Sequence, residues 1–341
     1  MRFLFDIGHP AHVHYFKNLI LLLQKQNHQV KLTARDKEMT LYLLDKYELD
    51  FVSTGKNASS LLGKALSLPL IESQIYKVAK EFNPNLIIST FTPYAAHVGK
   101  LMDIPVLGIT DTEHATLSNT LAKNFTDCLI IVKGCDLDFP NKRVDYDGFL
   151  ELAYLHPKYF NPNSEVLDFL KLSVTEKFVV LRFVSWNAAH DWGMHGFTLN
   201  EKKTLAKFLS KHAKVFISSE ESLPEEISDY KLEIPPEMIH DALYYSSLIV
   251  GDGATMSTEA ALLGTPSILT NPLSTKLGHL RQLEKEGLVY SITDFKEIVK
   301  KSSDILSSDV DYISRKNSLL ESKRSLTDVL MEELLLLTKQ H

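Results

Sequence analysis

Residues 248–269 read LIVGDGATMSTEAALLGTPSIL, and this stretch decides the fold class. The apolar run Leu248–Val250 predicts a strand, and residues 251–255 form a small, flexible turn after it. A helix is expected over 257–263, and Gly-Thr-Pro at 264–266 stops it and leads into the next strand. A strand, a helix and a second strand in this order are typical of a parallel sheet covered by helices.

The turn after Val250 has the features of an anion site. Gly251 and Gly253 lack a side chain, so backbone N–H groups at the helix start can approach a phosphate. Those N–H groups and the helix dipole both favour negative charge. Glu259 cannot hold a phosphate, but a carboxylate one turn into the helix suits the two hydroxyls of a ribose. The alternative is purely structural: a Gly-rich turn with Glu259 as a residue of the helix start.

Short β-type runs alternate with helical patterns along most of the chain. The expected strands are residues 1–6, 29–33, 50–54, 86–90, 105–110 and 128–132, and then 178–181, 215–218, 248–250 and 267–269. Between the two groups, from Asp145 to Asn163, the pattern weakens, and we interpret this segment as a linker. Such alternation indicates mostly parallel sheets covered on both faces, which bind ligands at the carboxyl ends of their strands.

We therefore predict an α/β protein with two Rossmann-like domains. Residues 1–153 are assigned to the first domain and residues 154–315 to the second. The last stretch, 311–339, has a helical pattern, and residues 316–341 are expected to form a C-terminal helix whose apolar end can pack back on the first domain. A cleft between two domains of this kind is a usual place for a ligand.

Composition excludes some classes of function. Hydrophobic residues make up 44% of the chain and charged residues 23%, as in ordinary globular proteins. The net charge of −6 argues against a nucleic-acid partner, which would require a basic surplus. Cys128 and Cys135 are the only cysteines, which suits a reducing cytosol. No apolar run is long enough to span a bilayer, so we expect a cytoplasmic protein, with a peripheral membrane contact left open.

The stretch 251–266 resembles the nucleotide-binding segment of GT-B glycosyltransferases, the class that includes the bacterial transferase adding GlcNAc to lipid-linked muramyl-pentapeptide. Those enzymes have a similar Gly-Ala-x-Thr/Met-x-x-Glu run before Gly-x-Pro, and their Glu, which holds the donor ribose, falls at Glu259. Ala11-His12-Val13 stands where their first turn ends in Gly-His-Val, and residues 85–119 follow their layout. More closely, most of the chain is similar to the DUF354 family, which is GT-B-like.

This resemblance implies a GT-B arrangement with an interdomain cleft and a UDP-sugar donor bound by the second domain. The residues expected at the donor site are Arg182, Gly251, Gly253, Ala254, Thr255, Met256, Glu259 and Gln282. Arg182 ends a strand and can neutralise a diphosphate leaving group, or it can be an ordinary strand-end salt-bridge partner. The loop 273–282, which would read the sugar, is only loosely like the family's Gln-rich version, so the donor sugar stays open.

Three histidines, His9, His12 and His14, crowd the start of the first helix. His12 is the candidate base, because an inverting transfer needs a group that takes the acceptor hydroxyl's proton, and imidazole titrates in the right range. The alternatives are polar residues at a helix end, or a zinc chelate of His12 and His14. Glu113, after the fifth expected strand, is the second catalytic candidate: it can orient the acceptor or replace His12 as base.

Further polar residues follow the same strand ends. The residues expected to bind the acceptor or a phosphate are Gly8, His9, Thr90, Thr92 and Asp111, which otherwise form turns or cap helices. Gly251 stands eight residues before Glu259, where retaining GT-B enzymes often carry a Glu, so inversion is favoured. The apolar stretch 61–70 is either a core helix or a surface for a lipid acceptor.

The predicted function is therefore a glycosyltransferase, of polysaccharide-biosynthesis type, that moves a sugar from a nucleotide sugar to a glycan or lipid-linked acceptor. We expect no metal and no other cofactor, and no nucleic-acid partner. One alternative is a hydrolysing nucleotide-sugar 2-epimerase, which shares the fold. Another is a non-catalytic protein that binds a nucleotide or glycan on a GT-B scaffold.

Overall fold

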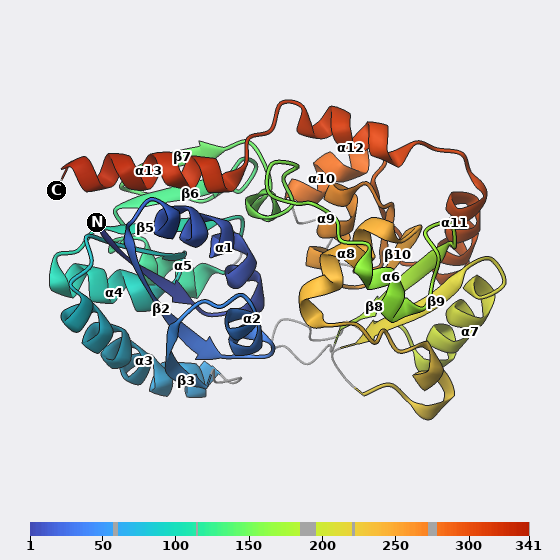
Figure 1. The fold of residues 1–341 in the computed structure, drawn as a ribbon, viewed down its shortest axis with the longest axis horizontal. Coiled ribbons are helices and arrows are strands. Elements are labelled where there is room, and N and C mark those ends of the chain that lie inside the picture. Colours follow the sequence, from blue (N-terminus) through green and yellow to red (C-terminus); the bar gives the residue numbers. More distant parts are fainter. Residues whose placement is uncertain (57–60, 114, 185–195, 220–221, 272–277, 341) are drawn as a thin grey trace. The chain divides into compact units, whose positions relative to one another are not determined.

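The computed structural model describes residues 1–56, 61–113, 115–184, 196–219, 222–271 and 278–340 (Figure 1). The chain divides into two compact units, residues 1–160 with 324–341 and residues 161–323. The division falls after Phe160, beyond the expected boundary at Ala153, because the residues between them contact the first unit. The Tyr154 ring packs on His14, and the Tyr159 hydroxyl donates to Asp328. The 3-10 helix η1 (Leu150–Ala153) precedes these residues and is buried in the same unit. The expected cleft between the two units stays a prediction.

The first unit contains a sheet of seven parallel strands in the order β3-β2-β1-β4-β5-β6-β7. The strands are β1 (Arg2–Ile7), β2 (Gln29–Asp36), β3 (Phe51–Lys56), β4 (Leu86–Thr90), β5 (Val106–Thr110), β6 (Cys128–Val132) and β7 (Lys142–Tyr146). The expected linker is wrong at its start, because β7 pairs with β6 along its whole length. This edge strand escaped prediction because most of its side chains are polar or charged and exposed.

Helices cover this sheet and follow the apolar stripes of the sequence. They are α1 (Pro10–Lys25), α2 (Thr40–Lys46), α3 (Leu61–Phe82), α4 (Pro93–Met102), α5 (Thr116–Ala122) and the C-terminal α13 (Leu326–Gln340). In α1 the stripe Val13, Phe16, Leu19, Ile20 and Leu23 is buried, as its spacing predicts. Helix α3 buries Ile71 and Ile75, which follow the apolar stretch 61–70. Within that stretch the described side chains are half-buried or exposed, and Leu66 and Leu70 are exposed, so the expected core helix is wrong for the described part of it.

The end of the chain departs from the predicted single helix. Residues 312–320 form α12 (Tyr312–Leu320), which packs on a helix of the second unit, whereas α13 packs on α1 and η1 (Figure 1). The helical pattern breaks before α13, where the Ser325 hydroxyl accepts a hydrogen bond from the Thr327 N–H. Thr327 in turn donates to the carbonyl of Ala153, which fixes the start of α13 on the first unit.

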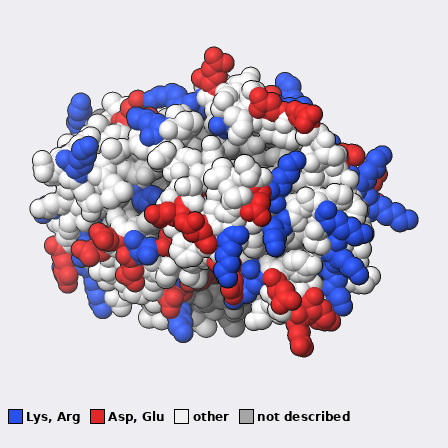
Figure 2. All heavy atoms as spheres, turned by 45° about the vertical axis from the view of Figure 1, so that its right-hand side comes forward, with Lys and Arg blue, Asp and Glu red and all other residues white. Residues whose placement is uncertain are grey.

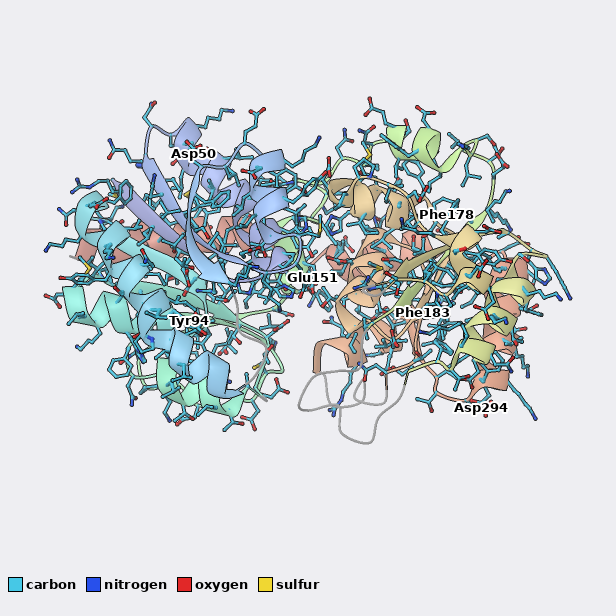
Figure 3. All side chains as sticks on the ribbon, turned by 90° about the horizontal axis from the view of Figure 1, so that it is seen from below. Asp50, Tyr94, Glu151, Phe178, Phe183 and Asp294 are labelled. Carbon is cyan, nitrogen blue, oxygen red and sulfur yellow. The ribbon has the colours of Figure 1, made fainter. Side chains whose placement is uncertain are left out.

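The second unit contains a sheet of five parallel strands in the order β12-β11-β10-β8-β9. The strands are β8 (Phe178–Phe183), β9 (Lys214–Ser219), β10 (Leu248–Gly251), β11 (Ser267–Leu269) and β12 (Val289–Ser291). Buried Phe178 and Phe183 mark the two ends of β8 (Figure 3). Strand β12 was not predicted, because only Val289 of its three residues is buried, whereas all three residues of the predicted β11 are buried.

Helices and 3-10 turns connect the strands of the second unit. They are α6 (Glu165–Leu170), α7 (Leu199–Leu209), α8 (Ile239–Tyr245), α9 (Ala254–Leu263), α10 (Gly278–Lys285), α11 (Phe295–Ser307) and α12, with 3-10 turns η2 (Glu225–Tyr230) and η3 (Pro236–Met238). Helix α9 ends at Gly264, whose φ of 91° is left-handed and favours glycine. The sequence thus folds 248–269 into the strand–helix–strand unit that its pattern predicts.

Charged side chains of both signs are scattered over the face drawn in Figure 2. Within the part of the chain that the structure describes, no helix is long and apolar enough to cross a membrane.

Candidate functional site

The carboxyl edge of the first sheet begins with the turn between β1 and α1. His9 has an extended backbone, and its Nδ1 accepts a hydrogen bond from the Ala11 N–H at 3.2 Å. Pro10 occupies the first position of the helix, where the missing N–H costs nothing. His9 therefore caps α1, and this local contact explains why a histidine stands there.

His12 lies in the first turn of α1 and faces the same edge. Its Nδ1 accepts a hydrogen bond from the Gly8 N–H at 3.1 Å, and the Thr90 hydroxyl lies 3.4 Å from both ring nitrogens. The ring is stacked on Tyr15, with 6.3 Å between centroids. Burial lowers the pKa of His12 well below its ordinary value, and the positive charges of His9, Arg35 and Lys37 lower it further. His12 is therefore a neutral imidazole at physiological pH.

Sequence reasoning missed a buried ion pair beneath this turn. Asp6, at the end of β1, is fully buried, and Arg35, at the end of β2, is 3% exposed. Two hydrogen bonds of 3.0 and 3.2 Å join the guanidinium to the carboxylate, and Thr33 donates a third at 3.0 Å. The guanidinium also lies 4.6 Å from the ring centroid of Tyr94, which α4 contributes (Figure 3). The signal available for this pair was that Asp6 and Arg35 carry opposite charges near the ends of two consecutive expected strands.

The ion pair shapes the turn through Gly8. A Cβ at this position would stand 2.2 Å from Nη2 of Arg35. Only glycine lets the backbone lie against the guanidinium, and the Gly8 N–H is the group that binds His12. Gly8, Arg35 and His12 therefore form one connected arrangement.

The ends of β4 and β5 carry the other candidates of the first unit. Thr92 precedes α4, and its buried hydroxyl has no hydrogen-bond partner among the described residues. Thr112 donates to the Asp111 carboxylate at 2.7 Å, and α5 begins only at Thr116, so the capping alternative for these residues is wrong. Burial and then a hydrogen bond to Glu113 raise the pKa of Cys135 to about 12, which places the Glu113 carboxylate against that thiol.

His14 does not join His12 in a metal site. Its side chain is buried and packs against the ring of Tyr154, with 5.2 Å between centroids. Over the residues that the structure describes, no group of three or more His, Cys, Asp or Glu side chains is arranged to hold a metal ion.

In the second unit, the Gly-rich turn lies against the end of β8. A Cβ on Gly251 would stand 2.2 Å from the carbonyl oxygen of Arg182, so only glycine allows this approach of the two strands. Buried Asp252 accepts a hydrogen bond from the Val184 N–H at 2.9 Å, which ties the turn to β8. Gly253 then precedes α9 with an extended backbone.

The first turn of α9 is open to a ligand in a way that the start of α1 is not. Among the described side chains, none caps α9 by a hydrogen bond, and no acidic residue stands in its first turn. The buried hydroxyls of Ser257 and Thr258 have no hydrogen-bond partner within the described part of the chain. Ala254 and Met256 are half-buried and Thr255 is exposed. The backbone N–H groups of this turn therefore lie where an anion can accept from them.

Arg182 borders the turn, with its Nη1 donating to the Ser218 hydroxyl at 3.0 Å. Its Cγ lies 3.1 Å from the position that a Cβ of Gly253 would take, so the side chain runs along the turn. Gln282 lies half-buried on α10. Residues 273–277 of the predicted sugar-reading loop lie outside the described residues.

Glu259 is buried on α9. Its side chain is 7% exposed, and its Oε1 lies 3.0 Å from Nε2 of His240, which is 6% exposed. Burial results because α8 packs on α9 at this point. His240 was missed by sequence reasoning, and the only signal for it, a histidine within an apolar helix, is too common to use.

The family comparison agrees with this layout. The family described as Protein of unknown function (DUF354) matches residues 1–337. The chain belongs to the DUF354 family. An uncharacterized protein of Methanocaldococcus jannaschii is 25% identical over 317 residues, covering 88% of this chain and 90% of its own length.

Solved structures resemble the DUF354 chain over nearly its whole length. The UDP-GlcNAc 2-epimerase of Neisseria meningitidis, bound to UDP-GlcNAc, has a TM-score of 0.70 at 13% identity, and the match covers 98% of this chain and all of that one. The glycosyltransferase SsfS6 of Streptomyces sp. SF2575 has a TM-score of 0.61 at 13% identity, covering 97% and 99%. At this identity the likeness shows the fold, which is the GT-B fold of two parallel α/β units.

The two sheet edges of the DUF354 chain thus differ in chemistry. The first collects His12, Thr90 and, after β5, the carboxylates of Asp111 and Glu113. The second offers the backbone N–H groups at the start of α9, which no described side chain caps, together with Arg182 and a buried carboxylate. The first suits hydroxyl groups and proton transfer, and the second suits a diphosphate next to a diol.

Proposed function

We propose that this DUF354 protein binds a nucleotide sugar on its second unit and transfers the sugar to a hydroxyl group of a glycan or lipid-linked acceptor bound by the first. The observation that carries the proposal is the start of α9. A Gly-rich turn, an uncapped helix with no acidic residue in its first turn, and Glu259 in the next turn occur together there.

Each part of the donor has a matching group. The diphosphate accepts hydrogen bonds from the N–H groups at 254–256, and Arg182 adds a positive charge beside them. The Glu259 carboxylate accepts from the ribose hydroxyls. His240 binds one of its oxygens and so fixes the orientation of the carboxylate before the ligand arrives.

Transfer then needs a base and a stabilised leaving group. The acceptor oxygen attacks the anomeric carbon while a base takes its proton, and the diphosphate leaves with the electron pair of the broken bond. The Glu113 carboxylate is the base in this proposal, because Nδ1 of His12 already accepts from Gly8. The α9 turn and Arg182 stabilise the charge that develops on the diphosphate, so the reaction needs no metal.

A hydrolysing 2-epimerase is the second candidate. It is favoured by the match to the epimerase of Neisseria meningitidis, whose TM-score of 0.70 exceeds the 0.61 of the glycosyltransferase SsfS6. Both reactions break the bond between the sugar and the diphosphate, and both use the same donor site. They differ in whether an acceptor hydroxyl is consumed.

The test is a thermal-shift screen of the full chain against nucleotide sugars, followed by product analysis with the strongest binder. A ligand of the folded state raises the melting temperature. Glu259→Gln is expected to reduce the shift, whereas the matched control Glu297→Gln, an exposed residue in the first turn of α11, leaves it unchanged. The absence of a shift with every nucleotide sugar would overturn the proposal.

Product analysis separates the two reactions. Transfer requires an added acceptor and releases a nucleoside diphosphate together with a new glycoside. Release of nucleoside diphosphate and an epimerised free sugar without acceptor identifies the epimerase instead. We expect turnover to survive EDTA, and turnover that is lost to EDTA and restored by Mg²⁺, Mn²⁺ or Zn²⁺ contradicts the metal-free mechanism.

A further inference from the structure

We propose that His12 acts on the substrate as a neutral hydrogen-bond donor through Nε2–H, and that the buried Asp6–Arg35 pair positions it through the Gly8 turn. The inference rests on the proposed function for its ligand, an oxygen atom of the nucleotide sugar or of the acceptor. It assigns to His12 a role opposite to that of a base, and it gives the ion pair a task beyond stability.

The hydrogen bond from Gly8 decides which ring nitrogen carries the proton. A backbone N–H can only donate, so Nδ1 of His12 must present its lone pair at the 3.1 Å contact. The neutral ring then has its hydrogen on Nε2. For Nε2 to act as a base, the hydrogen would have to move to Nδ1. There it would face the Gly8 N–H, and the hydrogen bond between the two groups would be lost.

The surroundings oppose the charged ring as well. An imidazolium would carry hydrogens on both nitrogens and lose the Gly8 bond. The groups facing it are His9 and Lys37, the Arg35 guanidinium with its Asp6 partner, the Thr90 hydroxyl and the Tyr15 ring. Three of these carry or can carry positive charge, and burial adds to their effect, so the pKa of His12 is lowered.

Nε2–H is left for a ligand. The nearest described acceptor is the Thr90 hydroxyl at 3.4 Å, which is longer than an ordinary N–H···O bond and is equally far from Nδ1. A neutral donor held in place can stabilise negative charge that develops on a substrate oxygen without giving up its proton. This assignment leaves the proton transfer to the carboxylates that follow β5.

The ion pair sets the position of the donor. Its two hydrogen bonds fix the plane of the Arg35 guanidinium against Asp6, and a Cβ on Gly8 would stand 2.2 Å from Nη2 and 2.8 Å from Cζ of that group. A shift of the guanidinium therefore moves the Gly8 N–H and, with it, the ring of His12. Arg35 and Asp6 are positioning residues, since neither side chain is exposed to a substrate.

The first test needs no substrate and is independent of the proposed function. Histidine labelled with ¹⁵N reports the tautomer of each ring, and the signal lost in His12→Gln identifies His12. We expect the Nε2–H form, still neutral at about pH 6, where an ordinary histidine is largely protonated. A ring with hydrogen on Nδ1, or one that titrates near pH 6.5, would overturn the inference whether or not the protein turns over a nucleotide sugar.

The same spectra test the positioning role. Arg35→Lys keeps the charge but cannot form the two-pronged bond to Asp6, so the Nε2–H signal of His12 is expected to shift and broaden in the folded protein. The control is Arg143→Lys, an exposed Arg–Asp pair on β7, which should leave the signal unchanged. An unaltered His12 signal in folded Arg35→Lys contradicts the positioning role.

Turnover gives the second test. In His12→Gln the side-chain amide can place an N–H near the position of Nε2, whereas in His12→Asn the amide reaches only the position of Nδ1. A donor role predicts that turnover of His12→Gln is higher than turnover of His12→Asn by about 10-fold or more. His156→Gln is the control, because Nδ1 of His156 also accepts a backbone N–H, from Lys158 at 3.1 Å.

A base role predicts a different pattern. Neither amide can accept a proton, so Gln and Asn would lose turnover equally, by about 10²-fold or more, and the acidic limb of the kcat/KM profile would change in both. Equal losses with an altered acidic limb therefore refute the donor role. If the tautomer is as expected and no nucleotide sugar is turned over, the proposed function and the donor role towards its substrate fail, whereas the neutral Nε2–H form of His12 and its positioning stand.

Discussion

The two sheets place a glycine between a strand and a helix in the same way, and yet the two turns are opposite in their electrostatics. At the first, His9 caps α1 and the charges of Asp6 and Arg35 neutralise each other within the protein. At the second, α9 has no side-chain cap, and buried hydroxyls stay unpaired among the described residues. The turn before α1 is capped and charge-balanced by its own side chains, so it can hold one neutral donor in place. The turn before α9 has the backbone donors that the proposed function assigns to an anion.

The largest effect is expected from a change that disrupts the buried ion pair at the first edge. Asp6→Ala removes the carboxylate and leaves the Arg35 guanidinium buried without its partner. An uncompensated buried charge costs about 3–5 kcal/mol of unfolding free energy, because desolvation is no longer offset. Chemical denaturation, followed by the loss of helical circular dichroism, measures this change.

The double variant Asp6→Leu with Arg35→Met separates the charge from the packing. It removes both charges and is expected to be markedly more stable than Asp6→Ala alone, because no charge is left unpaired. A double variant as unstable as Asp6→Ala would mean that shape, and not charge pairing, makes this edge stable.

The next effect concerns the ligand of the second edge. Glu259→Ala removes a hydrogen-bond acceptor for the ribose, and nucleotide affinity is expected to fall by about 1.5–3 kcal/mol, measured by calorimetry. The buried pair with His240 adds a loss of stability that an exposed Glu would not show. Glu259→Gln restores the shape and one hydrogen bond to His240, so it should recover stability more than affinity. Unchanged nucleotide affinity in the folded Gln variant contradicts the ribose assignment.

A third change tests how closely the turn must approach β8. The methyl group of Gly251→Ala would meet the carbonyl oxygen of Arg182 at 2.2 Å, and backbone cannot move aside as a side chain can. We expect a loss of about 1–3 kcal/mol in unfolding free energy. Gly253→Ala is the matched control, because its methyl would lie 3.1 Å from the flexible Cγ of Arg182. Equal stability of the two variants would show that the turn relaxes freely.

The sequence predicted the fold better than the contacts at its edges. The apolar runs of β1, β4, β5, β6 and β10 are buried strands with continuous hydrophobic patterns, which is why they could be recognised. Edge strands β7 and β12 could not, because β7 is mostly polar and exposed and β12 has a single buried residue.

The sequence predicted where the site residues stand in the chain, but not which other residues they contact. That His12 stands at the end of β1 follows from the strand–helix pattern, but its tautomer depends on the Gly8 N–H and on Arg35, which comes from the next strand. Glu259 was placed on the correct helix, whereas its partner His240 comes from a helix that precedes β10. Contacts between elements distant in the sequence leave no periodic signal, so a single sequence cannot reveal them.

The smallest expected effect is the pH dependence contributed by His12. Because the folded chain lowers the pKa of this ring below the ordinary value of about 6.5, the unfolded chain binds a proton that the folded chain does not. The contribution is constant above about pH 6.5, and stability is lost as the pH falls from there towards the folded pKa, with a slope of at most one proton. Urea midpoints at about pH 7.5 and pH 5.5 are therefore expected to differ more in the wild-type protein than in His12→Gln, where nothing at this position titrates. His156→Gln serves again as the control and should retain the full wild-type difference. A His12→Gln variant with the same pH dependence as the wild-type protein would mean that the ring has the same pKa in the folded and unfolded chains. The contrast between a neutral His12 at the first edge and the proposed anion site at the second would then fail.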